Sequence, residues 1–247
     1  MSTHFTILML GYNSLPFIEK SLASALGQEY DNFDVIAIDA ATNDGTWDLL
    51  SRYQDDPRLT TVRNERRRYV VENTFSGCRI AKPGTVMVQL DFDDWLASHR
   101  VLSILDEVYS AGDVWMTYGT YTEYPPRDVS HLYSAYPHEV IEANSFRTYS
   151  RWLASHLRTF RRELCLQIDQ DALRGPDGEF VKTAGDVALM YPMLEMAGHH
   201  SRYVPEILYV YNKLNPLSDD RVDPVDQEHV AAVLRGLPPQ QPLRELV

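Results

Sequence analysis

The chain has 247 residues, of which 44% are hydrophobic and 23% are charged, and its formal net charge is −12. This length suits one domain with a substantial core, and the composition is that of a soluble globular protein. The acidic balance argues against tight non-specific binding to nucleic acid or anionic membranes, because both rely on Lys and Arg side chains that neutralise phosphates.

Two cysteines, Cys78 and Cys165, are too few for a disulfide framework and match no zinc-binding spacing. Both lie in apolar-periodic segments, which indicates small core residues. No apolar run reaches the roughly 18 residues of a membrane span. Residues 1–10 lack Lys, Arg and a small-residue cleavage site, so they do not resemble a signal peptide. We expect a cytoplasmic protein without a membrane span.

Strands and helices alternate four times in the first hundred residues. Strands are predicted at residues 5–10, 34–39, 59–62 and 86–90, with helices after Ser14, around residues 47–53 and at 70–81. Ser14 suits a helix cap, with Pro16 in the first turn. The alternation predicts an α/β fold, a doubly wound and mostly parallel sheet with right-handed crossovers.

Polar residues follow each of these strands. In doubly wound sheets, ligands bind beyond the carboxyl ends of the strands. The residues at those ends are Gly11, Tyr12, Asn13, Asp39, Asn64 and residues 91–94. We therefore expect one binding site along this edge, although Tyr12–Asn13 and Asp39 also suit plain turns between elements.

The apolar run at 86–90 ends in three carboxylates, Asp91, Asp93 and Asp94. Carboxylates this close repel one another and resist burial, so the cluster needs a compensating cation. A divalent metal with an anionic ligand is the simplest explanation. The alternative is an exposed acidic turn that caps the next helix.

The second half of the chain has a less regular pattern. A helix is predicted at 101–109 and a strand at 114–118, and residues 119–146 are rich in Tyr, Pro and Ser without a clean period. Long loops of this kind are usually functional. Residues 145–160 are predicted to be helical in part, a helix starts near Asp186, and 208–211 form the last strand.

Several short segments, in order and at plausible spacing, resemble family 2 glycosyltransferases of the GT-A fold. They are Tyr12-Asn13-Ser14 and residues 18–28, 35–39 and 43–46, and Asp91-Phe92-Asp93-Asp94 resembles the family's metal-binding DxD motif. The resemblance covers residues 4–110 well and the remainder loosely. It implies one GT-A domain at 1–218, with a nucleotide-binding half at 1–110 and an acceptor half at 111–218. An acidic tail follows at 219–247.

The resemblance implies a hexosyltransferase-like enzyme with a nucleotide-diphosphate sugar as donor, and UDP is the expected nucleotide. Mn²⁺ or Mg²⁺ would act as a Lewis acid on the departing diphosphate. Asp93 and Asp91 are the expected metal ligands, with the donor ribose as an alternative contact of Asp91. Asp39 is expected to accept a hydrogen bond from a uracil-type base. Many relatives carry a second Asp where this chain has Ala40, which loosens the nucleotide assignment.

Further donor contacts are expected from Gly11, Tyr12, Asn13, Asn64, Arg68, Arg158 and Lys213. Arg68 ends a basic run that suits either a diphosphate clamp or a solvated surface. His156 suits the metal shell or the diphosphate, and Arg158 the diphosphate, unless both lie on a solvated amphipathic helix. Lys213 belongs to a segment that resembles the flexible loop closing over donor phosphates in this fold.

Sugar transfer with inversion needs a general base for the acceptor hydroxyl. By resemblance Asp186 takes this role, although the Glu that often precedes it is replaced by Gly185. Asp186 also suits a helix N-cap. Trp152 offers an apolar face on which an acceptor can stack. Asp94 is expected to assist on the acceptor side or to cap a helix.

The acceptor is left open by the sequence. A glycan, a protein side chain and a modified nucleobase are the candidates, and the acidic balance disfavours the last. The excursion after residue 118 carries tyrosines that suit either a carbohydrate platform or simple packing: Tyr118, Tyr121, Tyr124, Tyr133 and Tyr136. The sequence is compatible with an oligomer.

Two other functions compete with this one. A catalytically inactive module that binds sugar nucleotides or glycans with the same fold is favoured by Gly185 and Ala40. A sugar nucleotidyltransferase is disfavoured, because residues 11–14 hold one glycine and no basic side chain to cradle a triphosphate.

Overall fold

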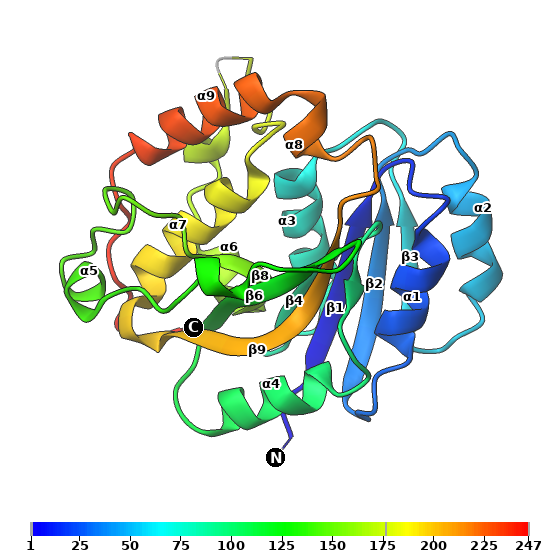
Figure 1. Cartoon of the computed structure of the whole chain (residues 1–247), viewed down its shortest axis with the longest axis horizontal. Helices are drawn as coiled ribbons and strands as arrows, with labels where there is room; N and C mark the ends of the chain where they lie inside the picture. The colour runs from blue at the N-terminus through cyan, green and yellow to red at the C-terminus, as the bar shows by residue number, and fades with distance from the viewer. Residues whose placement is uncertain (1, 176, 247) are drawn as a thin grey trace.

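The computed structural model describes residues 2–175 and 177–246, which form a nine-stranded sheet with helices on both faces (Figure 1). The strands are β1 (Phe5–Gly11), β2 (Phe33–Asp39), β3 (Leu59–Arg63), β4 (Val86–Asp91), β5 (Trp95–Leu96), β6 (Met116–Tyr124), β7 (Arg127–Asp128), β8 (Ser155–Arg161) and β9 (Ser201–Asn212). The helices are α1 (Ile18–Leu26), α2 (Thr46–Leu50), α3 (Val70–Ile80), α4 (Val101–Ser110), α5 (His138–Glu142), α6 (Arg162–Leu166), α7 (Gly185–Ala197), α8 (Asp219–Val222) and α9 (Pro224–Arg235).

The sheet has the order β3-β2-β1-β4-β8-β6-β9-β5, and β7 pairs with the edge of β6. Strands β3, β2, β1 and β4 are mutually parallel, as predicted. Strand β8 runs antiparallel between β4 and β6, and β9 is parallel to β6. The predicted mostly parallel, doubly wound sheet is confirmed, with mixed strand directions in its second half.

The residues of β1 alternate between two cores on opposite faces of the sheet. Phe5, Ile7 and Met9 face a core shared with α1 and α4, whereas Leu8 and Leu10 face a core shared with α3, α6 and α7. Successive side chains of a strand point to opposite faces, so a continuous apolar run fits a strand covered on both sides. The strand ends are thereby fixed relative to one another.

Two predicted elements differ from the structure. Helix α1 begins at Ile18 rather than at Ser14, because the backbone carbonyl of Ser14 accepts from the amides of Phe17 and Ile18 in a preceding turn. The prediction that residues 145–160 are partly helical is wrong. The segment ends in strand β8, which is buried from Ser155 to Phe160. A strand covered on both faces has no polar alternation, and its polar residues gave a misleading helical pattern.

The acidic segment predicted as a tail packs against the rest of the domain. Ala231 and Leu234 of α9 are buried in the core that contains α7. The amide of Leu243 donates to the carbonyl of Met196, the penultimate residue of α7. Within residues 2–175 and 177–246, no helix combines the length and the apolar character that crossing a bilayer requires.

A buried ion pair joins this C-terminal segment to α7. Arg147 Nε lies 2.5 Å from Glu195 Oε1, and neither side chain is more than 8% exposed. The Glu195 carboxylate also accepts from the amide of Gln240, and Arg147 donates to the carbonyl of Leu234. The pair therefore connects the excursion before β8, helix α7 and the end of the chain.

We predict that Arg147→Met lowers the free energy of unfolding by about 3–5 kcal/mol, because it leaves the Glu195 carboxylate buried and unpaired. Urea denaturation measures this loss. Adding Glu195→Gln removes the charge and keeps an acceptor for Gln240, so the double variant should be more stable than Arg147→Met alone. A double variant that is less stable than the single one would contradict this account.

Candidate active site

A cavity of about 240 Å³ opens at the carboxyl ends of β1 and β4, beside the segment that joins β9 to α8 (Figure 1). Most of the predicted site residues line it: Gly11, Tyr12, Arg68, Asp91, Asp93, Asp94, His156, Arg158 and Asp186. They come from the ends of β1 and β4, from β8, from the start of α7 and from the loop before α3. Strand ends far apart in sequence thus converge on one site, as expected for a doubly wound sheet.

The end of β1 is shaped by Gly11. A Cβ placed there would lie 2.3 Å from Phe92, so only glycine lets the chain after β4 approach this closely. The next residue, Tyr12, lines the cavity and lies under the guanidinium of Arg67, 4.1 Å from the ring centroid. Asn13 has a positive φ of 50° and its side chain accepts from the amide of Asn43, which fixes the turn before α1.

Asp39 lies at the end of β2 but is fully buried, and its carboxylate is engaged locally. Oδ1 accepts from the amide of Thr42 at 2.9 Å, and Oδ2 from the hydroxyl of the same residue at 2.5 Å. Arg63 lies 3.9 Å away. The neighbouring Ala40, rather than Asp39, lines the cavity. Asp39 therefore orders the loop beside the site.

Asn64 is also buried and does not line the cavity itself, but it contacts a residue that does. It donates to Asn73 of α3 at 2.8 Å, and Asn73 in turn donates to the carbonyl of Arg68. Both Asn73 and Arg68 line the cavity. The Arg68 Nε lies 3.2 Å from Glu72, so this guanidinium is held at the rim by the first turn of α3.

Asp94 is the buried member of the carboxylate cluster, and it caps no helix, since Arg100 precedes α4. It accepts from the hydroxyl of Tyr209 at 2.6 Å and from the amide of Asn212 at 2.7 Å. Burial, and then the charges of Asp93 and Asp91, raise the pKa of Asp94 well above its ordinary value. The helix-capping alternative is therefore wrong, and Asp94 anchors β9 to the end of β4.

Asp93 and Asp91 present their carboxylates to the cavity. Asp93 Oδ2 accepts from the side-chain amide of Asn215 at 2.7 Å, and its carbonyl accepts from Asn212. The hydroxyl of Tyr209 lies 3.5 Å from Asp91 Oδ2. Two carboxylates on one cavity wall supply the hard oxygen donors that Mg²⁺ and Mn²⁺ prefer, so these residues fit the predicted metal.

His156 is stacked between aromatic rings. Its ring lies 4.3 Å from that of Tyr209 and 5.6 Å from that of Tyr211, centroid to centroid. Burial, and then the charges of Arg158 and Lys213, hold the pKa of His156 well below its ordinary value. The neutral ring accepts a 2.7 Å hydrogen bond at Nε2 from Arg158. This hydrogen bond therefore orients the guanidinium of Arg158.

Arg158 is a buried cation on the cavity wall. Its side chain is 8% exposed, and its Nη2 lies 3.8 Å from Oδ2 of Asp186. Among the described residues, its Nε is buried without a hydrogen-bond partner. A buried guanidinium that is only partly satisfied favours an anionic ligand in the adjoining space.

Asp186 lies in the first turn of α7 and is 28% exposed. The residue at the N-cap is Ala184, so the predicted capping alternative for Asp186 is wrong. The preceding Gly185 packs on α3: a Cβ at this position would lie 3.0 Å from Cβ of Val70. Val70 thus fills part of the space that a larger residue at 185 would need.

Trp152 and Lys213 do not line the cavity. Trp152 packs edge-on against Tyr191 of α7, with ring centroids 5.0 Å apart. Lys213 lies over the ring of Tyr211 at 4.2 Å, and Tyr211 lines the cavity. Of the tyrosines in the excursion, Tyr118 and Tyr136 are buried, whereas Tyr121 packs on His156.

The sequence missed several residues that line the cavity: Gln89, Asn73, Lys182, Tyr211, Asn215 and Gln227. Asn215 lies two residues after Lys213, in the segment predicted to close over the donor. That position in the sequence could have indicated a role in the site. Gln227 belongs to α9, which lies in the segment predicted to be an acidic tail. Lys182 precedes α7 in an irregular loop that carries no periodic signal.

The comparisons with known proteins agree with this geometry. The family model described as glycosyl transferase family 2 matches residues 6–168. The UDP-Glc:alpha-D-GlcNAc-diphosphoundecaprenol beta-1,3-glucosyltransferase WfaP of Escherichia coli is 28% identical over 96 residues, which are 39% of this chain and 38% of WfaP.

Two solved structures share the fold at low identity. TarS (residues 1–349) of S. aureus, in complex with UDP-GlcNAc, superposes with a TM-score of 0.68 at 16% identity, over 92% of this chain and 64% of TarS. The mannosyltransferase PcManGT of Pyrobaculum calidifontis, with GDP-Man and Mn²⁺, gives 0.60 at 22% identity, over 85% and 57%. The predicted GT-A type of fold is confirmed. The chain spans less than two thirds of each of these relatives.

We predict that His156 makes the stability of the protein depend on pH. The unfolded chain takes up a proton on this ring near pH ~6.5, whereas the folded chain does so only at lower pH. The stabilisation is therefore complete above about pH 6.5 and declines as the pH falls below it. Urea denaturation at about pH 7.5 and about pH 5 should show a smaller pH-dependent loss for His156→Gln than for the parent.

The exposed His229 provides the matched control, since His229→Gln should leave the pH dependence as in the parent. Equal losses in the parent and in His156→Gln would show that His156 is not the buried neutral histidine described above.

Proposed function

The chain belongs to glycosyl transferase family 2, and we propose that it transfers a sugar from a nucleotide-diphosphate donor to an acceptor hydroxyl. The observation that carries the proposal is one cavity with two opposed kinds of charge. Asp91 and Asp93 line it at the end of β4, and the buried Arg158 lines it from β8, beside Asp186. A donor diphosphate bound through a divalent ion needs carboxylates for the ion and a cation for its own remaining charge.

We assign the diphosphate to the space before Arg158. The guanidinium is buried, its Nε has no hydrogen-bond partner within the described chain, and the neutral ring of His156 fixes its orientation. Planar guanidinium groups bind phosphate oxygens in a bidentate manner. Arg68, which lines the cavity, and Lys213, whose charge acts on His156, add positive potential around the same space.

We assign the divalent ion, Mn²⁺ or Mg²⁺, to Asp93 and Asp91. When bound, the ion would neutralise charge on the departing diphosphate as a Lewis acid. We assign Asp94 a structural role instead, because it is buried and both of its oxygens already accept hydrogen bonds, from Tyr209 and Asn212. Asn215 donates to Asp93 and so orients the carboxylate that we expect to contribute most. PcManGT binds Mn²⁺ in the same fold.

We assign the general base to Asp186. It is partly exposed to the cavity, so an acceptor hydroxyl has access to it. Nη2 of Arg158 lies 3.8 Å from its carboxylate and adjoins the same space. A single displacement requires one such base for the acceptor hydroxyl, and it inverts the anomeric carbon.

UDP is the nucleotide that we expect, and a saccharide hydroxyl is the acceptor. WfaP is named for transfer from UDP-Glc to an acceptor that bears GlcNAc, and TarS was solved in complex with UDP-GlcNAc. PcManGT binds GDP-Man, so GDP is the competing nucleotide. Asp39 orders the loop at the end of β2 through Thr42, next to Ala40, which lines the cavity.

We predict that Asp93→Asn and Asp186→Asn fail at different steps. Asp93→Asn should weaken Mn²⁺-dependent binding of UDP at least tenfold, because a metal ligand is lost. Asp186→Asn should bind UDP like the parent and slow transfer by about 10²–10⁴-fold, which is the usual contribution of a general base. Calorimetry with UDP and Mn²⁺ and a UDP-release assay with a saccharide panel measure the two effects.

Asp55→Asn is the matched control, since Asp55 is an exposed carboxylate outside the site. Normal transfer by Asp186→Asn would refute the assignment of the base. If the parent binds UDP-sugars but releases no UDP with any saccharide, protein or nucleobase acceptor, the chain is an inactive binding module instead.

We predict that Arg158→Gln weakens UDP binding at least tenfold, whereas Arg158→Lys retains part of the affinity. Lysine preserves the charge but not the planar fork that contacts two phosphate oxygens at once. Uridine binding should be the same in both variants and in the parent, because uridine has no phosphate. If Arg158→Gln weakens uridine and UDP equally, Arg158 does not contact the diphosphate.

A further inference from the structure

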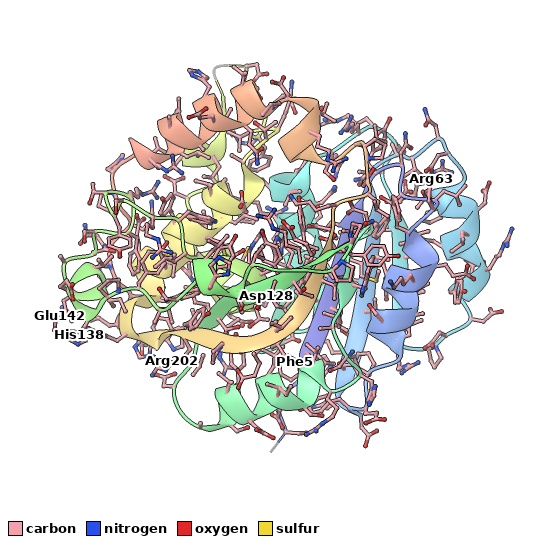
Figure 2. The ribbon with its side chains drawn as sticks, viewed as in Figure 1. Phe5, Arg63, Asp128, His138, Glu142 and Arg202 are labelled. Carbon is pink, nitrogen blue, oxygen red and sulfur yellow. The ribbon has the colours of Figure 1, made fainter. Side chains whose placement is uncertain are left out.

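Three metal-ligating side chains gather on the surface far from the candidate active site. They are His138 and Glu142 of α5 and His199, which follows the end of α7. Figure 2 shows His138 and Glu142 beside each other at the edge of the molecule, and Figure 1 places α5 at the end opposite α1 and α2. All three side chains are exposed, so an ion from solution has direct access.

The chain brings these groups together in two ways. His138 and Glu142 are four residues apart on one helix, which puts both on the same face. His138 Nδ1 lies 3.6 Å from Glu142 Oε2. Gly198, with a φ of 49°, ends α7 and turns the chain so that His199 meets α5. The rings of His138 and His199 are 5.3 Å apart, centroid to centroid.

The ligand atoms of the three side chains lie almost as close together as in a metal site. One ligand atom from each residue lies within 4.8 Å of the other two. In a tetrahedral zinc site with bonds of about 2.0–2.1 Å, neighbouring ligand atoms are roughly 3.3 Å apart. Exposed side chains close the remaining gap by small rotations about their own bonds. Arg202, the nearby cation labelled in Figure 2, donates to the backbone carbonyls of His199 and Ser201.

The donor set selects the type of ion. Two imidazoles and one carboxylate suit Zn²⁺, whereas Mg²⁺ and Ca²⁺ prefer oxygen donors alone. The Asp91–Asp93 carboxylates of the cavity have the opposite preference. Helix α7 rises about 1.5 Å per residue, which puts Ala197, two residues before His199, about 17 Å from Asp186. The two clusters are therefore separate in place and in chemistry.

We propose that His138, Glu142 and His199 bind Zn²⁺, with water in the remaining coordination positions. A bound ion would join α5, in the excursion between β7 and β8, to the end of α7. The excursion and α7 are also linked by the Arg147–Glu195 pair. Zinc would thus restrain the irregular excursion against the helix that begins at the candidate base.

The test is calorimetric titration of ZnCl₂ into the full chain, free of any affinity tag. Asp93→Asn serves as the background, because it weakens binding of metal in the cavity. We expect one Zn²⁺ per chain in this background, and at least tenfold weaker binding after addition of His199→Ala or His138→Ala. His131→Ala, at an exposed histidine of the same excursion, is the matched control and should bind as the background does.

Thermal denaturation gives a second readout. Zn²⁺ should raise the Tm of the Asp93→Asn background and not that of its His199→Ala derivative, while the two have the same Tm without metal because the substituted side chain is exposed. The proposal is overturned if His199→Ala binds Zn²⁺ as tightly as the background, or if Asp93→Asn abolishes zinc binding. A ratio of one ion per two chains would overturn it by assigning the ion to a contact between copies.

Discussion

The site depends on the way β9 is tied to the end of β4. A run of three carboxylates at a strand end is unfavourable by itself, because each charge resists burial and repels its neighbours. Tyr209 and Asn212 satisfy the most buried member, Asp94, and Asn215 donates to Asp93. These contacts span more than a hundred residues of sequence. They bring the second half of the chain to the edge of the parallel sheet, and they aim the carboxylates at the cavity.

The same contacts divide the work among the acidic residues. Asp94 is held by uncharged donors, and burial raises its pKa, so it acts as a structural link. Asp93 and Asp91 remain at the cavity and carry the charge that attracts a cation. On the neighbouring strand β8, the low pKa of His156 keeps that ring neutral, so the positive charge there is concentrated on Arg158. A diphosphate bound with a divalent ion complements both the carboxylates and this cation.

The parallel half of the fold was predictable because its strands are continuous apolar runs that end in polar residues. Asp93 was predicted on this basis and by resemblance, Asp186 was predicted by resemblance alone, and the structure brings both to one cavity. The second half was less predictable. Strand β8 is buried on both faces, which hides its period, and its residues His156 and Arg158 line a site that only the tertiary structure creates. Asn215 lies in a segment that was predicted to close over the donor, but neither it nor Gln227 was predicted individually.

The pair of Val70 and Gly185 bears on whether the site is active. A glycine where relatives often have Glu suggests a damaged motif when the sequence is considered alone. In the structure, Val70 of α3 packs on that glycine, so the space is filled by a neighbouring side chain rather than left empty. The close approach places α3 directly beside the first turn of α7. Asp186 follows in this turn, and its carboxylate lies 3.8 Å from Nη2 of Arg158. The packing of Val70 therefore explains why glycine, and not Glu, stands at position 185, and the candidate base Asp186 stays in place.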